Sequence, residues 1–286
     1  MTDRIVDIAE RAVSLRVDLE RLRIDREGKD PVHIPLAELA AVVVSNRDVR
    51  LSQSVLAGLA AHGGVFVVID EAFQPAAMML PLDGHSTASA RMRKQAAVGL
   101  ATRKRVWRAL VVAKIRAQWS LLQELGLESD DGEALATRVR SGDPDNLEAT
   151  AASKYWKRLF GPAFRRDRDA NDQNRLLNYG YAVLRAATAR ALCAVGLHPA
   201  LGVHHHNQYS AFCLADDLME PFRPLVDRAV VQLTRECGPT VRMDADLRGR
   251  LIAPVVARYA VAGESRAFFD IHAQNASAPV SYTHLA

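Results

Sequence analysis

The sequence predicts an α+β protein in which a small N-terminal β-sandwich-like domain with one helix precedes a larger all-helical domain. Short alternating and β-branched runs concentrate in the first 80 residues, and long helix-forming stretches follow them. Pro81, Asp83 and Gly84 mark the change in composition. We therefore place the first domain at 1–84 and the second at 85–279.

Two kinds of pattern predict the strands of the first domain. Apolar and polar residues alternate over 15–19 and 22–24, as in half-buried strands. The apolar runs at 42–44 and 65–69 are rich in β-branched residues, which favours strands. Between these runs, apolar residues recur at helical spacing and predict one helix over 52–62.

The second domain is predicted to consist of long helices. The first of them, 88–125, is rich in Ala, Leu, Arg and Lys, lacks proline and ends at Gly126. The remaining predicted helices cover 132–139, 144–159, 173–195, 212–236 and 245–262. This number of helices in about 180 residues is sufficient for a bundle.

Length and composition exclude several classes of protein. The chain has 286 residues, 49% hydrophobic and 24% charged, which excludes a disordered, collagen-like or disulfide-scaffold chain. No stretch is apolar enough for a membrane span or a secretory signal, so we expect a cytoplasmic protein without a membrane partner. Three cysteines without CxxC spacing argue against a zinc knuckle and are expected to be buried.

Basic residues concentrate in the second domain. Residues 1–90 carry 9 basic and 13 acidic side chains, whereas residues 91–286 carry 28 and 20. No acid occurs between Asp83 and Glu124, which favours a polyanionic partner over the alternative of a solvated helix face. The basic residues of this window are Arg91, Arg93, Lys94, Arg103, Lys104, Arg105, Arg108, Lys114 and Arg116.

Three places in the second domain concentrate groups that bind metal. Residues 204–206 are three histidines at a predicted turn, Asp217 and Glu220 lie one helical turn apart, and Glu148 lies among small residues. Each group alone is typical of a solvated surface. Because the helix with Asp217 and Glu220 is otherwise apolar, it must bury some carboxylates, and buried carboxylates require a cation.

The donor types indicate which ion and which chemistry to expect. Oxygen ligands with a single imidazole favour magnesium or manganese over zinc. In a basic helical domain such an ion indicates phosphodiester chemistry, in which a water or a sugar hydroxyl attacks in line. No glycine-rich nucleotide-binding motif occurs, which argues against an ATP-driven enzyme.

Several segments together resemble one known family. The run 197–227, which includes LHPALGVHH and DLMEPFRP, is similar to the CRISPR-associated spacer-acquisition integrases, Cas family one, of the type II branch. The segments 155–161 and 176–182 are also similar to that family, and 35–39 and 52–69 resemble its small β domain. The resemblance covers nearly the whole chain up to about residue 275.

The resemblance implies a metal-dependent DNA endonuclease and integrase that inserts foreign DNA fragments into a CRISPR array. Glu148, His205 and Glu220 match the family's metal ligands, with Asp217 as an auxiliary group. The neighbouring His206 makes the histidine assignment ambiguous by one residue, and Ser210 stands where the family often has Asn. The 3′-hydroxyl of the captured fragment would attack a phosphodiester at the repeat boundary, with a magnesium or manganese ion as cofactor.

The resemblance also implies partners and a division of roles. Double-stranded DNA is expected along the basic residues of the second domain, which would hold its backbone without reading bases. The residues assigned to this surface are Arg91, Arg93, Lys94, Arg103, Lys104, Arg105, Arg165, Arg166 and Arg168. The β domain is expected to form a homodimer, and a small ferredoxin-like protein of Cas family two is expected as a partner.

Two alternative functions remain open at this level: a catalytically inactive DNA-binding subunit, and a stand-alone nuclease acting on branched DNA. The C-terminal residues 280–286 resemble a translated sequencing adapter, and we interpret them as a non-native tail.

Overall fold

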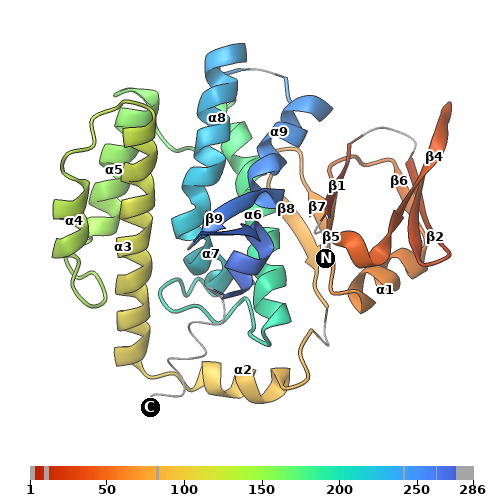
Figure 1. Cartoon of the computed structure of the whole chain (residues 1–286), viewed down its shortest axis with the longest axis horizontal. Helices are drawn as coiled ribbons and strands as arrows, with labels where there is room; N and C mark the ends of the chain where they lie inside the picture. The colour runs from red at the N-terminus through yellow and green to blue at the C-terminus, as the bar shows by residue number, and fades with distance from the viewer. Residues whose placement is uncertain (1–3, 10–12, 82–83, 241, 262, 275–286) are drawn as a thin grey trace.

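The computed structural model describes residues 4–9, 13–81, 84–240, 242–261 and 263–274. Two four-stranded sheets form the N-terminal part, and most of the remaining chain is helical (Figure 1). The predicted order, a β-rich part followed by a helical part, is confirmed. The predicted tail at 280–286 lies outside the described residues.

The first sheet is the one that joins the two parts of the molecule. Its strand order is β1-β5-β7-β8, formed by β1 (Arg4–Ile8), β5 (Leu39–Val44), β7 (Val65–Ile69) and β8 (Pro75–Met79). β5 is buried along its whole length. Because side chains alternate along a strand, Val42 and Val44 face the second sheet, whereas Ala41 and Val43 face the helices. The β-rich part therefore shares one hydrophobic core with the helical part.

The second sheet has the order β4-β3-β2-β6. It consists of β2 (Val13–Asp18), β3 (Arg21–Arg26), β4 (Lys29–Pro35) and β6 (Val49–Leu51). Leu15 of β2 and Leu22 of β3 are fully buried against the first sheet and against Leu59 of α1 (Gln53–Ala61). The short 3₁₀ helix η1 (Leu36–Glu38) leads from β4 into β5.

The helical part begins with α2 (Ala88–Ala96), which runs beneath the other helices and leads into α3 (Leu100–Glu124) (Figure 1). The two were predicted as one helix, and the break is explained by Gly99, an extended residue that begins α3. The next helices are α4 (Gly132–Arg138), α5 (Leu147–Phe160) and α6 (Gln173–Ala194). α3, α4 and α5 share a core centred on Ile115 and Tyr155.

The predicted helix over 212–236 is divided. It consists of α7 (Cys213–Met219), the 3₁₀ turn η2 (Glu220–Phe222) and α8 (Arg223–Cys237). Pro221 and Pro224 explain the division, because a proline cannot donate the backbone hydrogen bond of a helix interior. The last predicted helix was also too long, since α9 (Ala245–Val256) ends before the hairpin of β9 (Arg258–Val261) and β10 (Glu264–Ala267).

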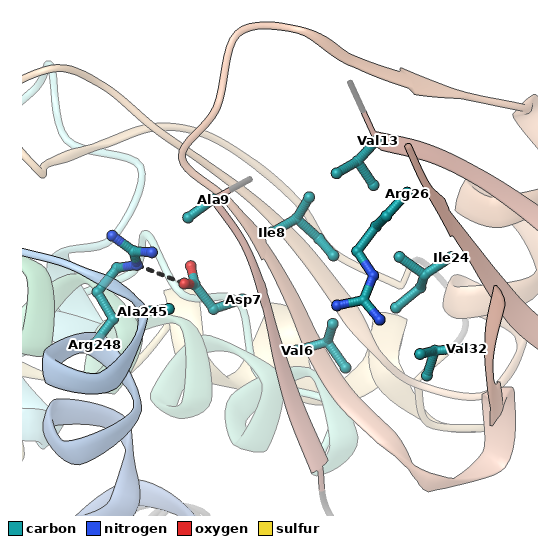
Figure 2. Close-up of a pocket in the computed structure, with 10 residues that line it drawn as sticks. All are labelled: Val6, Asp7, Ile8, Ala9, Val13, Ile24, Arg26, Val32, Ala245 and Arg248. Atoms are coloured by element: carbon teal, nitrogen blue, oxygen red, sulfur yellow. Dashed lines mark hydrogen bonds and ion pairs between the residues drawn. The ribbon is translucent and has the colours of Figure 1, made fainter. Parts of the chain in front are cut away.

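A buried ion pair ties α9 to the N-terminal sheets. The Nε of Arg248 donates to Oδ2 of Asp7 on β1 at 2.6 Å (Figure 2). The Nη1 of Arg248 also donates to the carbonyl of Met243. The pair borders a cavity of about 190 Å³ between α9 and the two sheets. The all-helical description of the second part needs one correction, because this part contains the hairpin of β9 and β10. The second part also packs directly on β1.

Two smaller expectations can be compared with the described residues. Cys193 and Cys213 are buried as predicted, whereas Cys237 is exposed at the end of α8. Among the described helices, none is long and apolar enough to cross a membrane.

Candidate metal centre

The structure brings together side chains that lie far apart in the sequence. Glu148 lies in the first turn of α5, His205 lies in the loop between α6 and α7, and Glu220 begins the 3₁₀ turn after α7. Lys114 reaches the same place from the middle of α3. The helices α3, α5, α7 and η2 are therefore the elements that position the site.

Glu148 is placed by the start of its helix. The carboxylate of Asp143 accepts the backbone N–H groups of Leu147 at 3.0 Å and Glu148 at 2.9 Å, and so satisfies two donors that a helix start leaves free. Asn146 enters the helix from a left-handed conformation, with φ of 50°. These features fix the backbone of the first turn of α5, while the Glu148 side chain remains 25% exposed.

Lys114 is buried between the two glutamates. Its ammonium pairs with Oε1 of Glu148 and lies 2.5 Å from Oε2 of Glu220. Burial lowers the pKa of Lys114, but the charges of Glu220 and Glu148 outweigh this effect and raise the pKa above its ordinary value. The two carboxylates therefore favour the charged form of this side chain inside the site.

Glu220 has a second cationic partner. Nη2 of Arg223, one turn later, lies 2.9 Å from Oε1 of Glu220, and its guanidinium also lies over the ring of Tyr181. Burial raises the pKa of Glu220, but Arg223 and Lys114 outweigh burial and hold the pKa below the ordinary value. Glu220 is thus an ionised carboxylate although it is 5% exposed.

His205 is oriented by Asp217, which is fully buried. Oδ1 of Asp217 lies 2.6 Å from Nδ1 of His205, and the same carboxylate accepts the backbone N–H groups of Val203, His204 and His205. The hydrogen bond to Asp217 raises the pKa of His205. With Nδ1 engaged, Nε2 is the ring nitrogen left for a ligand, the arrangement found in carboxylate–histidine–metal sites.

The neighbouring His204 is held in a different way. Its ring stacks on buried Trp107 of α3, with ring centroids 3.9 Å apart and planes 4° apart. Burial lowers the pKa of His204 and so favours the neutral ring that packs on the indole. Trp107 also meets the His205 ring edge to face. The stack fixes the loop that carries His205.

The donor set fits a hard divalent cation. Among the described residues, no three His, Cys, Asp or Glu side chains lie close enough together to hold a metal ion as they stand. The buried Oε2 of Glu220 nevertheless lies 2.5 Å from the Lys114 ammonium, so a cation already occupies the position beside this carboxylate. Two carboxylates that converge on one cation, beside an imidazole with an oriented ring, are ligands suited to magnesium or manganese.

A polar cavity of about 480 Å³ opens beside His205. Arg168, Arg185 and Arg223 line it together with Asp216, which accepts a hydrogen bond from Nε of Arg185 at 2.6 Å. Tyr209 on the same lining is 87% exposed. The cavity therefore offers guanidinium groups and an aromatic ring next to the candidate metal ligands.

The basic residues predicted to contact DNA divide into two groups. Arg93, Lys94, Lys104, Arg105 and Arg165 are exposed, whereas Arg91 and Arg103 are half-buried. Nη1 of Arg91 donates to the carbonyl of Val195.

Arg166 and Lys114 differ from the expectation. The guanidinium of Arg166 is engaged by the side-chain oxygens of Asn174 at 2.9 Å and Asn178 at 2.7 Å. Lys114 belongs to the predicted basic stretch but is 6% exposed, so it cannot contact a DNA backbone at the surface.

Four residues of the site were missed as site residues from the sequence: Trp107, Lys114, Asp143 and Arg223. A signal for Lys114 was present, because Trp107, Val111, Lys114 and Gln118 follow one another at spacings of four, three and four. These spacings place them on one face of a helix, and all four are buried.

A mixed fold that places two carboxylates on one buried lysine, beside an oriented imidazole and an arginine-lined polar cavity, suits an enzyme that acts on a phosphate-bearing substrate. The family model described as "CRISPR associated protein Cas1" matches residues 7–238. The chain therefore belongs to the CRISPR-associated Cas1 family, and the predicted CRISPR-associated endonuclease is confirmed.

Two relatives agree with this membership. The CRISPR-associated endonuclease Cas1 of Neisseria meningitidis is 35% identical over 240 residues, which cover 83% of this chain and 78% of the relative. An endonuclease Cas1 of Thermus thermophilus is 32% identical over 243 residues, which cover 80% of this chain and 75% of the relative.

The solved structures show a shared fold. A casposase bound to its integration product has a TM-score of 0.80 at 18% identity, covering 99% of this chain and 91% of the casposase. A Cas1 protein of Thermotoga maritima has a TM-score of 0.73 at 16% identity, covering 97% of each chain.

Proposed function

We propose that this Cas1 protein is the integrase that inserts foreign DNA fragments as new spacers into a CRISPR array, with Glu148, His205 and Glu220 as its metal ligands. The observation that carries the proposal is the convergence of Glu148 and Glu220 on one buried cation beside the imidazole oriented by Asp217. This arrangement provides the acidic and imidazole donors that a divalent ion requires.

A bound magnesium or manganese ion would polarise the phosphate and lower the pKa of an attacking 3′-hydroxyl or water. Glu148 and Glu220 would supply the oxygen ligands, and His205 would supply Nε2. Asp217 acts as an auxiliary positioning group, because it holds both the ring and the loop backbone of His205. Arg223 keeps Glu220 ionised and lines the adjoining cavity.

DNA would reach the site across the polar cavity. Arg168 and Arg185 are placed to pair with phosphates there, and the exposed ring of Tyr209 is a surface on which a base can stack. The exposed residues Arg93, Lys94, Lys104 and Arg105 on α2 and α3 would hold the duplex backbone, with Arg91 and Arg103 beside them. Arg165 extends this contact after α5, whereas Arg166 supports it from within through Asn174 and Asn178.

We further propose the partners that the family resemblance implies. The chain would form a homodimer through residues 1–84 and join a small ferredoxin-like Cas2 protein, while residues 85–279 act on DNA in the cytoplasm. A solved complex described as "Cas6-RT-Cas1–Cas2" contains a chain of similar fold, with a TM-score of 0.76 at 18% identity. That likeness concerns the fold, so a pull-down with the Cas2 partner is the appropriate test.

The integrase proposal is tested by strand transfer into a supercoiled array plasmid, with a labelled short duplex, the Cas2 partner and magnesium or manganese. We expect Glu220→Ala to lower the rate at least about a hundredfold, as for the loss of a transition-state stabiliser. Duplex binding measured by fluorescence anisotropy is expected to change little.

The matched control is Glu236→Ala, which removes an exposed glutamate of α8. It should leave strand transfer intact. Unchanged strand transfer by the Glu220→Ala protein would overturn the metal-ligand assignment.

A further inference from the structure

The role of Lys114 is not explained by the metal ligands alone. It is a buried cation on α3, a helix whose Val111, Ile115 and Gln118 are also buried, and it contacts both candidate ligand carboxylates. Arg223, which pairs with the other carboxylate oxygen of Glu220, already supplies one positive charge. A buried lysine at this point is costly unless its charge serves the two carboxylates.

Two carboxylates that share a site repel each other when both are ionised. Glu148 and Glu220 have their facing oxygens, Oε1 and Oε2, in contact with the same ammonium. Lys114 therefore supplies the cation that makes their approach favourable before a metal ion binds. Removal of a partner from such a buried cluster leaves uncompensated charge.

The ammonium and a divalent ion compete for the same oxygens. The Lys114 Nζ lies 2.5 Å from Oε2 of Glu220, and Mg²⁺ bound to the same oxygen would lie at about 2.0–2.1 Å. The ammonium of Lys114 and a divalent ion cannot occupy the position between Oε1 of Glu148 and Oε2 of Glu220 at the same time.

We propose that Lys114 is a resident cation that holds Glu148 and Glu220 together in the metal-free protein and that a divalent ion must displace it from between them. The inference rests on the proposed function, because it takes these glutamates as the metal ligands. It assigns Lys114 a positioning role in which the side chain both preassembles the site and limits its affinity for metal. In such an exchange, a stronger contact between Lys114 and the glutamates weakens metal binding, and metal binding weakens that contact by the same free energy.

The experiment compares the full chain with Lys114→Met, which keeps the length of the side chain and removes its charge. Mn²⁺ affinity is measured by calorimetry, and thermal unfolding is measured in EDTA and in saturating Mn²⁺. We expect Lys114→Met to unfold at a lower temperature in EDTA and to bind Mn²⁺ about tenfold more tightly. Saturating Mn²⁺ should consequently raise its unfolding temperature more than that of the unaltered protein.

The control variant is Lys157→Met, which removes an exposed lysine from α5. It should change neither measurement. If Lys114→Met fails to fold, Lys114→Gln replaces it and must show the same gain in Mn²⁺ affinity, while Lys114→Arg, which keeps the charge, must not.

The outcomes separate this inference from the proposed function. Equal or weaker Mn²⁺ binding by the neutral variants, with the unaltered protein still binding Mn²⁺ through Glu220, overturns the displacement role of Lys114 and leaves the metal centre intact. Absence of Mn²⁺ binding from the unaltered protein, or binding that Glu220→Gln does not weaken, overturns the metal centre itself.

Discussion

Asp217→Asn is the substitution that most directly tests how the site is assembled. The carboxylate receives the backbone N–H groups of Val203, His204 and His205 at 2.7, 3.0 and 3.2 Å, and it contacts Nδ1 of His205 at 2.6 Å. An asparagine keeps the shape but has one acceptor oxygen. Its amide group would point hydrogens at donors where the second carboxylate oxygen accepted them.

The size of the effect follows from these four contacts. If two of them lose their acceptor, at about 1.5–3 kcal/mol for each hydrogen bond to a charged group, the free energy of unfolding falls by about 3–6 kcal/mol. The unfolding temperature should then fall by roughly 10 °C, at about 2–4 °C per kcal/mol. Because His205 loses its oriented Nδ1 contact, strand transfer should fall about tenfold to a hundredfold.

Three measurements check this prediction. Calorimetry follows the unfolding temperature, the plasmid assay follows strand transfer, and NMR of the His205 ring follows its pKa, which should decrease when the Asp217 charge is removed. Asp246→Asn, at an exposed position in the first turn of α9, is the control. Unchanged strand transfer with an unchanged His205 pKa would refute the argument that Asp217 orients the imidazole.

Two further predictions concern DNA binding and pH. If the α2–α3 surface neutralises about five phosphates, a plot of the logarithm of the duplex-binding constant against the logarithm of salt concentration should have a slope near −4.5. Joint replacement of Lys104 and Arg105 by Gln should bring this slope about 1.8 nearer zero. An unchanged slope in a salt titration would show that neither residue contacts the DNA. Burial raises the pKa of Asp227 to about 6, although the hydroxyls of Tyr181 and Tyr155 donate to it. Since the folded pKa lies above the unfolded value of 3.8, the contribution of Asp227 to the free energy of unfolding is complete below pH 3.8 and is lost as pH rises through 6. This loss amounts to about 3 kcal/mol in the unaltered protein, and Asp227→Asn should reduce it. Urea unfolding at pH 3.5 and 7 measures the free energy of unfolding of both proteins, and equal pH dependence would contradict the assignment.

Local patterns predicted the elements better than their ends. The apolar runs 42–44 and 65–69 became β5 and β7, because β-branched residues suit strands that are covered on both faces. The helix predicted over 88–125 is interrupted before α3, at Gly99, and the helix predicted over 212–236 is interrupted at Pro221. Both breaks depend on single residues that interrupt an otherwise helical composition, and one of them places Glu220 at the site.

The sequence by itself determined the order of a β-rich part and a helical part, the excess of basic residues after Asp83, and the motifs that carry the family resemblance. These properties are local, since they depend on residue type and on spacing along the chain. Only the tertiary structure decided that Lys114 leaves the basic surface and enters the site, and that Glu148 and Glu220 meet across it. Such meetings depend on how α3, α5 and η2 pack, and packing is a property of the whole core rather than of any one segment.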